Sequence, residues 1–309
     1  MINFVKLPYV VLVLISVSFI SCKQSYDGKK GLDTILKGNV TILVDETLKP
    51  IIDDQVAVFE SRYEAKINLD ARSESEVIKS FLNDSTRIAI LSRTLNQDEA
   101  KKFERMHITP KITKIGIDAI AFIRNNGSKD TLIALADVIR FMQGKEQTNI
   151  KGLVFDNPNS STVRYMNDLS GIKEIPTKGV FSFKTNEDVI KYVAENEGMI
   201  GVVGVNWLSQ PSADLKSDMK NINVLYVKSL NNNGYFAPSQ NNIAEGTYPL
   251  ARDLYIINGQ GYSGLGMGFA SFVAGDIGQR IILKSGLLPV RMPGRNIIIK
   301  SNIKVDKKQ

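Results

Sequence analysis

Four short polar stretches of the sequence follow apolar segments and carry side chains that could bind an anion. They are Asp45-Glu46-Thr47, Arg72-Ser73-Glu74-Ser75, Ser92-Arg93-Thr94 and Asn159-Ser160-Ser161-Thr162. Serine and threonine hydroxyls donate neutral hydrogen bonds, and an arginine can donate two parallel bonds to one oxyanion. A helix that begins at such a stretch adds unpaired N–H groups and a partial positive charge, so an oxyanion could be held without a metal. Serine and threonine are also ordinary helix N-caps, and only the recurrence of the pattern favours an anion site over that structural role.

The counts of cysteine and histidine restrict the other kinds of chemistry. Cys22 and His107 are the single examples of their types, so an intrachain disulfide, a cysteine-ligated zinc or iron–sulfur centre and a multi-histidine metal site are excluded. A Ser-His-Asp triad would have to use His107, which precedes Pro110 at the end of a predicted helix. A hydrolase or phosphatase with Ser92 or Ser160 as its nucleophile would therefore lack a general base. We expect no enzyme activity, no cofactor and no metal.

Strands that alternate with amphipathic helices must position these polar stretches. Runs of β-branched residues predict strands, and apolar residues spaced three and four apart predict helices. In the first part of the chain the predicted elements are strands 40–44, 65–69 and 87–91 and helices 48–62, 74–82 and 97–105. After a break at Pro110 come strands 115–123, 151–155, 199–205 and 249–257 and helices 132–142, 163–169, 187–195, 265–273 and 278–283. Such alternation predicts crossover connections and a mostly parallel sheet, and ligands bind such sheets at the carboxyl ends of the strands.

The N-terminal segment resembles the signal peptide of a bacterial lipoprotein. Lys6 precedes an apolar run over residues 10–20, which is shorter than a membrane-spanning helix requires, and Ser21-Cys22 follows. Because Cys22 is the only cysteine and the sequence turns polar after it, we predict a signal peptide at 1–22, lipidation of Cys22 and a tether over 23–38. The alternatives are a signal peptide with an incidental cysteine and an uncleaved anchor.

The charge distribution argues against a nucleic-acid partner. The chain carries a formal net charge of +7, but its basic residues are scattered, and several of them lie in a solvated tail at 300–309. A nucleic-acid-binding domain would concentrate them on one face or along one helix. We expect no nucleic acid to bind.

Several segments resemble the phosphate-binding subunit of bacterial phosphate importers, which is a type II periplasmic binding protein. The matching segments are residues 44–47, 90–94, 117–122, 156–164, 198–202, 248–252, 278–281 and 286–289. The resemblance implies an α/β fold of two Rossmann-like lobes, joined by a two-stranded hinge, that close on an anion and present it to a membrane permease. The break at Pro110 and the strand that returns at 249 predict a discontinuous lobe 1 at 39–113 and 249–299, and lobe 2 at 114–248.

The matching loops imply which side chains bind the anion. Thr47 would donate from lobe 1, and Ser160, Ser161 and Thr162 would donate from lobe 2. Residues 73–75 would form a further donor loop of lobe 1.

Two positions depart from the family pattern. After the third strand the family commonly has a carboxylate where this chain has Arg93, and before the hydroxyl loop it commonly has an arginine where this chain has Asp156. Arg93 is then the only full positive charge that the sequence places at the site. A carboxylate in the site would accept a phosphate proton and repel fully ionised sulfate. The candidates for that acceptor are Asp45, Glu46, Glu74 and Asp156.

Together these features predict a membrane-tethered solute-binding protein that captures inorganic phosphate for an ABC importer. The predicted ligand-binding residues are Thr47, Glu74, Ser92, Arg93, Ser160, Ser161 and Thr162, with Glu46, Ser75 and Asp156 as further candidates. The alternatives are a bilobal lipoprotein that binds another oxyanion such as sulfate, and a sensor or adhesion module without transport. We expect a monomer, lipid-anchored in the cell envelope and facing the periplasm or the exterior.

Overall fold

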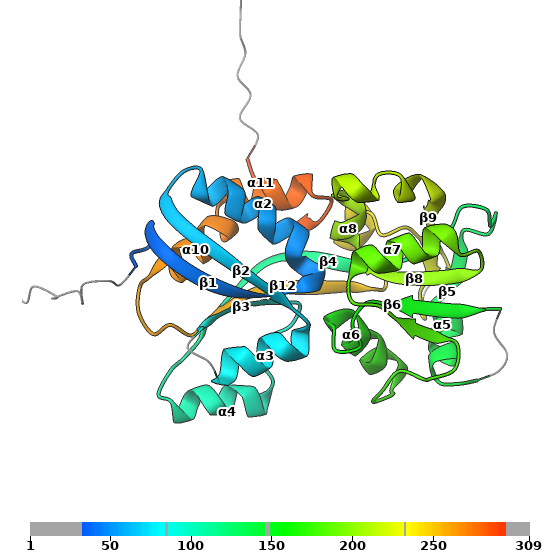
Figure 1. Cartoon of the computed structure of the whole chain (residues 1–309), viewed down its shortest axis with the longest axis horizontal. Helices are drawn as coiled ribbons and strands as arrows, with labels where there is room; N and C mark the ends of the chain where they lie inside the picture. The colour runs from blue at the N-terminus through cyan, green and yellow to red at the C-terminus, as the bar shows by residue number, and fades with distance from the viewer. Residues whose placement is uncertain (1–32, 84–85, 146–148, 232, 295–309) are drawn as a thin grey trace, which may run out of the picture. The chain divides into compact units, whose positions relative to one another are not determined.

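One mixed β-sheet organises the chain in the computed structural model, which describes residues 33–83, 86–145, 149–231 and 233–294. The strands along the sheet follow the order β2-β1-β3-β12-β4-β8-β6-β7 (Figure 1). Their bounds are β2 Glu64–Arg72, β1 Lys37–Asp45, β3 Ile88–Leu91, β12 Ala251–Asn258, β4 Lys111–Asn125, β8 Met199–Gly204, β6 Gly152–Phe155 and β7 Val180–Ser182. Two further strands, β9 (Ile222–Val224) and β13 (Leu288–Pro289), pair with β4.

Strand β4 joins two halves of this sheet. Its residues 111–119 pair with β12, and its residues 120–124 pair with β8. We call β2, β1, β3 and β12 with their helices the first half, and β8, β6 and β7 with theirs the second half. The helices of the first half are α2 Lys49–Glu60, α3 Glu74–Asn83, α4 Gln97–Arg105, α10 Leu265–Ala274 and α11 Asp276–Lys284. Those of the second half are α5 Leu135–Met142, α6 Ser161–Ser170, α7 Asn186–Glu195 and α8 Val205–Ser209.

The alternation of strands and helices confirms the predicted α/β fold. Strand β1 pairs in parallel with both β2 and β3, and β6 pairs in parallel with β7 and β8, whereas β12 runs antiparallel to both of its neighbours. The described residues from Asp33 onward form one compact unit. The exact lobe boundaries at 113/114 and 248/249 therefore stay a prediction.

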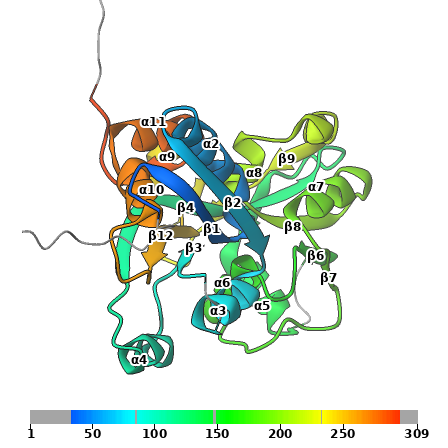
Figure 2. The same ribbon diagram turned by 60° about the vertical axis from the view of Figure 1, so that its left-hand side comes forward.

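Side chains of the first half alternate between two cores, as the twofold period of a strand requires. In β1, Ile42 and Val44 join a core that includes Phe59 of α2 and Phe269 of α10. Leu43 instead joins a core under α3 and α4. Helices α2, α10 and α11 thus cover one face of the sheet while α3 and α4 cover the other (Figures 1 and 2). Burial on both faces explains why β1 and β3 are runs of Val, Ile and Leu.

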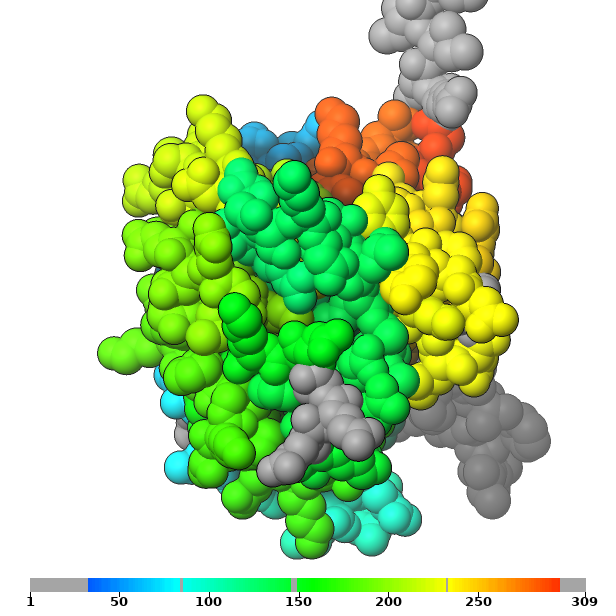
Figure 3. Space-filling view, turned by 90° about the vertical axis from the view of Figure 1, so that its right-hand side faces the viewer, coloured from blue at the N-terminus to red at the C-terminus, as the bar shows by residue number. Residues whose placement is uncertain are grey.

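The prediction of one helix over 132–142 is wrong for its first three residues. Residues Leu132–Ala134 form strand β5, and α5 begins at Leu135. β5 pairs with β10 (Tyr226–Lys228), which pairs with β11 (Tyr235–Phe236) in a separate small sheet. Figure 3 looks onto the second half and shows the yellow segment that contains α9 (Gln240–Ala244) beside the green segments.

The N-terminal predictions fall largely outside the described residues. The predicted signal peptide, Cys22 and residues 23–32 of the predicted tether are among those not described. Asp33 lies within the predicted tether, but its carboxylate accepts hydrogen bonds from the Tyr262 hydroxyl at 2.7 Å and from the Leu265 backbone at the start of α10. Contacts with the folded unit are therefore present before the predicted end of the tether at residue 38. None of the described helices has the length and apolar character needed to cross a membrane.

Candidate anion-binding site

The end of strand β1 turns directly into the first group of polar side chains. Asp45 is the last residue of β1, and a 3₁₀ turn over Glu46–Leu48 follows. One carboxylate oxygen of Asp45 accepts a hydrogen bond from the Thr47 backbone N–H at 3.2 Å, which stabilises this turn. The Asp45 and Thr47 side chains are both fully buried. Strand β1 therefore brings a carboxyl group and a hydroxyl group into the interior.

Helix α6 brings a second group of hydroxyls from the second half. Ser160 is its N-cap and accepts a hydrogen bond from the Val163 backbone N–H at 3.2 Å, and Ser161 and Thr162 lie in its first turn. All three of these hydroxyl-bearing residues are at most 3% exposed. Because the first N–H groups of a helix have no partner within the helix, this end of α6 combines side-chain and backbone donors.

Thr47 and Ser161 meet where the two halves contact each other, and with the neighbouring Thr162 we call them the hydroxyl cluster. Ser161 Oγ lies 3.4 Å from Thr47 Oγ1. Asn206 Nδ2 and Trp207 Nε1 donate to the Thr47 carbonyl at 2.9 and 3.0 Å, which holds the β1 turn against α8. The hydroxyl oxygen of Thr162 is buried and has no hydrogen-bond partner among the described residues. Since buried polar groups are normally paired, this hydroxyl is available to a ligand.

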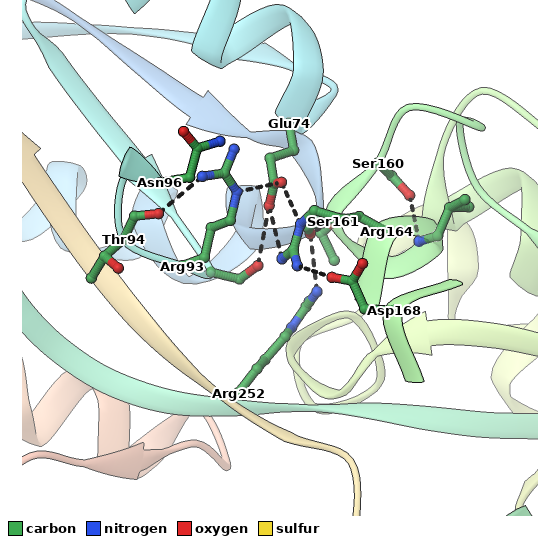
Figure 4. Close-up of polar contacts among 12 residues, drawn as sticks. Glu74, Arg93, Thr94, Asn96, Ser160, Ser161, Arg164, Asp168 and Arg252 are labelled. Atoms are coloured by element: carbon green, nitrogen blue, oxygen red, sulfur yellow. Dashed lines mark hydrogen bonds and ion pairs between the residues drawn. The ribbon is translucent and has the colours of Figure 1, made fainter. Parts of the chain in front are cut away.

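Arg252 brings a guanidinium to the hydroxyl cluster. It lies on β12, opposite Asp118 of β4 in the register of the two strands, and is 4% exposed. Its Nη1 donates to Ser161 Oγ at 2.9 Å (Figure 4). Its Nε and Nη2 donate to one oxygen of Asp118 at 3.1 and 2.8 Å. The prediction that Arg93 is the only full positive charge at this site is therefore wrong. Arg252 had been identified from the sequence only as part of a structural landmark.

Arg93 has a different set of contacts. Its Nε donates to Glu74 at 2.9 Å, and its Nη1 and Nη2 donate to the two oxygens of Glu99 at 2.8 and 2.9 Å. Nη1 also donates to the Thr94 carbonyl at 2.9 Å. Glu99 in turn completes the capping box of α4 with Asn96. These contacts direct the guanidinium of Arg93 to carboxylates of the first half.

Glu74 connects the two halves through Arg164 of α6. Arg164 donates from Nε to one Glu74 oxygen at 2.6 Å and from Nη2 to the other at 3.2 Å, while its Nη1 donates to Asp168 at 3.0 Å. The Glu74 side chain is 3% exposed and the Arg164 side chain is 31% exposed. Figure 4 shows Glu74 between two guanidiniums that come from opposite halves. We call Glu74, Arg93, Glu99 and Arg164 the arginine cluster.

A third group, which we call the acid layer, consists of Glu46, Asp156 and Asn186. Asn186 Nδ2 donates to Glu46 and to Asp156, both at 3.0 Å, so one amide bridges carboxyl groups from the two halves. Asp156 also accepts a hydrogen bond from Ser160 Oγ at 2.5 Å. Burial, with the charge of Asp156, raises the pKa of Glu46 to about 8. Burial, with the charge of Asp45, raises the pKa of Asp156 to about 7.

Asp45 is a buried carboxyl group close to both halves of the site. Burial raises the pKa of Asp45 to about 6; the charge of Glu74 adds to this rise, and Arg252 opposes it. Its second carboxyl oxygen is buried and has no hydrogen-bond partner in the described part of the chain. Asp45 can therefore hold or release a proton near neutral pH, and it keeps one oxygen available to a ligand.

Two cavities border the arginine cluster. One of 550 Å³ is lined by Ser75, Asn159 and Ser160, and the other, of 730 Å³, is lined by Ser92 and Arg252; Arg93 and Arg164 line both. The described residues contain no group of three or more His, Cys, Asp or Glu placed to hold a metal ion.

Comparison with known proteins assigns the family of this fold. The profile of the family described as "PBP superfamily domain" matches residues 33–276. The chain belongs to the PBP superfamily. Among relatives of this PBP-superfamily chain, the phosphate-binding protein PstS of Borreliella burgdorferi strain B31 is 24% identical over 273 residues, which cover 82% of this chain and 90% of the relative.

Solved structures with the PBP-superfamily fold resemble the chain over most of its length. A putative phosphate ABC transporter substrate-binding protein from Clostridium perfringens, crystallised with bound phosphate, superimposes with a TM-score of 0.68 at 20% identity, covering 82% of this chain and 100% of that chain. An ABC-type phosphate transport receptor from Vibrio cholerae gives a TM-score of 0.61 at 15% identity, covering 82% of this chain and 100% of that chain. At these identities the comparison supports the fold.

The residues that the sequence predicted to bind the ligand are distributed over the three groups of the site. The hydroxyl cluster contains Thr47, Ser161 and Thr162, and the arginine cluster contains Glu74 and Arg93, with Ser92 Oγ 3.5 Å from Glu74. The acid layer contains Glu46 and Asp156, with Ser160 bonded to Asp156. Ser75 is exposed and takes part through its backbone, which donates to the Asn159 carbonyl at 3.2 Å. A role in ligand binding stays a prediction for each of them.

Four further residues of the site were not among the predicted ligands. Asp118 is the one charged residue in the apolar run 115–123, and that contrast was a signal that could have identified it. Arg252 is followed directly by Asp253 and lacks that contrast. Arg164 follows the hydroxyl loop by two positions, at a spacing that carries it one turn into α6. Asn186 has no such signal, because it resembles any polar residue at the start of a helix.

Proposed function

We propose that this chain binds inorganic phosphate at the hydroxyl cluster and presents it to an ABC permease. The observation that carries the proposal is the convergence of buried neutral donors from both halves: Thr47 after β1, and Ser161 at the start of α6, where Arg252 donates to it. A tetrahedral oxyanion needs several donors around it, and helix N-termini, hydroxyls and a guanidinium provide them without a metal. The relatives named above, which are described as phosphate-binding proteins, favour phosphate among the oxyanions.

Binding without catalysis is part of this proposal. Of the two serines that an enzyme would use, Ser160 is the N-cap of α6 and donates to Asp156. Ser92 lies next to Glu74, a carboxylate that accepts from two arginines. Neither serine has the partner that an activated nucleophile needs.

A lipid tether completes the proposed role. We propose that Cys22 becomes the acylated N-terminus and that the protein acts as a monomer in the cell envelope, next to the permease. Cys22→Ser should release the protein from the membrane fraction or block its processing. A Cys22→Ser protein with unchanged mature mass and unchanged membrane association would contradict the tether and leave the binding proposal intact.

Isothermal titration calorimetry on the purified full-length chain in mild detergent tests the binding proposal. The chain is first unfolded, dialysed and refolded to remove carried-over anions, and then titrated separately with phosphate and sulfate. We expect phosphate to bind and sulfate to compete poorly. Ser161→Ala should weaken phosphate binding by roughly ten- to a hundredfold, the value of a hydrogen bond to a charged group.

A matched control separates loss of a donor from loss of any hydroxyl. Ser61→Ala removes the exposed hydroxyl at the end of α2 and should leave the phosphate affinity unchanged. Tight binding of sulfate or another oxyanion, with no heat from phosphate, would keep the fold and replace the ligand. No binding of any oxyanion would favour a sensor or adhesion module.

A further inference from the structure

The first described residues of the chain are fastened to helix α10. The Asp33 carboxylate accepts hydrogen bonds from the Tyr262 hydroxyl at 2.7 Å and from the Leu265 backbone N–H. A Cβ atom added to Gly268 of α10 would overlap the Ile35 carbonyl oxygen, so this close approach of the two backbones requires glycine. The point at which the predicted tether reaches the folded unit is therefore fixed on the first half.

That point lies at the end of the sheet opposite the anion site. Strand β1 runs parallel to β3, and β12 runs antiparallel to both β3 and β4. The starts of β1 and β4 and the end of β12 therefore share one end of the sheet, with the start of β1 beside α10 (Figures 1 and 2). Asp45 and Thr47 lie at the other end of β1.

Exposed apolar side chains gather at this end of the sheet. Ile35 and Leu36 precede β1 and are 46% and 45% exposed, and Ile112 near the start of β4 is 48% exposed. Lys111, the first residue of β4, is exposed and has no carboxylate within ion-pair distance in the described part of the chain. Single exposed apolar residues are ordinary, but a group of them beside an unpaired lysine indicates an interaction surface. We call Ile35, Leu36, Lys111 and Ile112 the strand-start surface.

A cavity of 290 Å³ beside Lys111 offers hydrogen-bond donors. Its lining includes Lys111, Thr109 and Ser263 and contains no aspartate or glutamate. The buried Asn258 also lines it; its side-chain oxygen accepts from the Gln260 backbone N–H at 2.9 Å, while its Nδ2 donates to none of the described residues. A cation, two hydroxyls and an amide together suit a phosphate group.

The turn after α4 brings two of these donors to the end of the sheet. His107, which also lines the cavity, has a φ of 55° and is the one described residue other than glycine in a left-handed conformation. Its N–H donates to the Glu104 carbonyl at 2.9 Å, and residues 109–111 then lead into β4. Such a backbone conformation is uncommon and is often kept at functional positions.

Resting on the lipid tether proposed above, we propose that the strand-start surface docks on an anionic lipid membrane. Roughly ten residues separate Cys22 from Asp33 and can span at most about 40 Å, so this end of the first half stays within reach of the lipid. The apolar side chains of the surface enter the headgroup layer, and the cavity beside Lys111 binds a lipid phosphate.

The charge of the surface favours anionic lipid as the partner. A lysine is attracted to anionic headgroups, and a cavity lined by no acidic residue adds no repulsion of its own. Because the anion site lies at the other end of β1, docking leaves phosphate binding unchanged. The contact orients the tethered protein on the membrane.

Lysine acetylation on vesicles tests the inference. The full-length chain is inserted through its N-terminal anchor into vesicles of phosphatidylcholine, with or without phosphatidylglycerol, and is labelled with a water-soluble acetylating reagent. Mass spectrometry should show that Lys111 is labelled about fivefold more slowly on the anionic vesicles, the effect of one lysine near such a surface. About 1 M salt should restore the labelling, because the Debye length then falls to about 3 Å. Lys178, an exposed residue of the second half, is the internal control and should be labelled equally on both vesicles.

The double variant Ile35→Ser/Leu36→Ser tests the apolar part of the surface. It should raise the labelling of Lys111 on anionic vesicles toward the rate on phosphatidylcholine alone, while calorimetry finds an unchanged phosphate affinity. Leu230→Ser is the matched control, because Leu230 is 56% exposed on the second half; it should keep Lys111 protected. Circular dichroism melting curves confirm that the variants fold.

The outcomes separate this inference from the functions on which it depends. Equal labelling of Lys111 on both kinds of vesicle overturns the inference and leaves the tether and phosphate binding intact. Protection of Lys111 by free phosphate on phosphatidylcholine vesicles also overturns it, because the cavity would then bind a soluble anion. A chain that is absent from the vesicle fraction overturns both the tether and the inference. If the double variant does not fold, the labelling of the unaltered chain still decides the question.

Discussion

The arginine cluster and the hydroxyl cluster lie close together but handle charge in opposite ways. In the arginine cluster, two guanidiniums and two carboxylates are fully engaged with one another, and Arg164 is about a third exposed. The hydroxyl cluster consists of neutral groups, to which Arg252 donates from β12, and its Thr162 hydroxyl is buried without a partner among the described residues.

This difference assigns separate tasks to the two regions. Ion pairs at the border of the site hold α3 against α6, and they stabilise the contact between the halves whatever lies inside. Unpaired neutral donors in the interior gain most from a ligand, because a buried polar group without a partner is costly. We infer that the ion pairs of the arginine cluster hold the two halves together, and that the neutral donors and the Arg252 guanidinium bind the ligand.

Arg252→Met should have the largest effect, because it removes the cation of the hydroxyl cluster. Asp118 would remain buried without its partner, which typically lowers the free energy of unfolding by about 3–5 kcal/mol. Phosphate affinity should fall by more than about a hundredfold. Urea denaturation and calorimetry measure the two effects. The double variant Arg252→Met/Asp118→Asn should recover stability but not affinity, and recovery of both would show that Arg252 serves only the fold.

Glu74→Gln tests whether the arginine cluster acts on closure alone. The amide cannot hold two guanidiniums, so we expect the contact between the halves to lose roughly 1.5–3 kcal/mol. Phosphate should then dissociate roughly ten- to a hundredfold faster, measured by stopped-flow displacement. Glu104→Gln, at an exposed position of α4, is the control. A changed preference between phosphate and sulfate would instead make Glu74 a direct ligand, as the sequence predicted.

The acid layer, together with Asp45, and the arginine cluster should respond to pH in opposite directions. The pKa values of Asp45, Asp156 and Glu46 are raised to about 6, 7 and 8, so the folded chain holds more protons than the unfolded chain between about pH 4 and pH 8. The free energy of unfolding contributed by these groups therefore decreases as the pH rises through that window.

The arginine cluster supplies the opposite trend. Burial opposes ionisation of Glu99, but its hydrogen bonds with Arg93 and Asn96 prevail and lower its pKa; the stabilisation from Glu99 is therefore lost as the pH falls through that lowered value. Denaturation of the unaltered chain and of Asp156→Asn, followed across the pH range, separates the two trends. Asp156→Asn should flatten only the alkaline side, and a loss on the acidic side would show that the regions are coupled.

Ser75→Ala should have the smallest effect, and it tests whether a side chain at the border of the site contributes to phosphate binding. The Ser75 side chain is exposed and lines a cavity, and the contact of this residue with the second half uses its backbone. We expect the phosphate affinity to change by less than about twofold, as for most surface substitutions. Calorimetry beside Ser161→Ala makes the contrast direct. A tenfold loss of phosphate affinity would show that Ser75 binds the ligand, as the sequence analysis proposed for it as a further candidate.

Local patterns predicted most of the fold. Strand β1 and helix α2 follow from residues 40–62 alone, because burial on both sides of the strand selects a β-branched run and the helix shows its apolar stripe. The loops after β1 and β3 could also be predicted as neighbours, since carboxyl ends of parallel strands share one edge. Strand β6 runs in the opposite direction to β1, so the meeting of its loop with the β1 turn does not follow from that rule.

Contacts between distant segments account for what the sequence did not reveal. Strand β5 exists because Leu132–Ala134 pairs with Tyr226–Lys228, and the three-residue strand carries no period of its own. The role of Arg252 depends on its register opposite Asp118, and one residue of slip would turn it away from Ser161. Arg93 was predicted to bind the ligand because the sequence does not show that it pairs with Glu99. Glu99 lies on the following helix, α4, and accepts a hydrogen bond from Arg93 only in the folded chain.

Strand β12 has a consequence for the order in which the chain can fold. It lies between β3 and β4, although about 125 residues separate the end of β4 from its beginning at Ala251. As the ribosome extends the chain, β3 and β4 both remain open edges until β12 has emerged, so the sheet that carries Asp45 and Thr47 cannot close early. Non-local pairing of this kind is slow, and nascent chains that stop before Ala251 should stay sensitive to protease throughout the first half, whose strands β3 and β4 both need β12. The delay leaves the first half without its central strand for most of the synthesis of the chain.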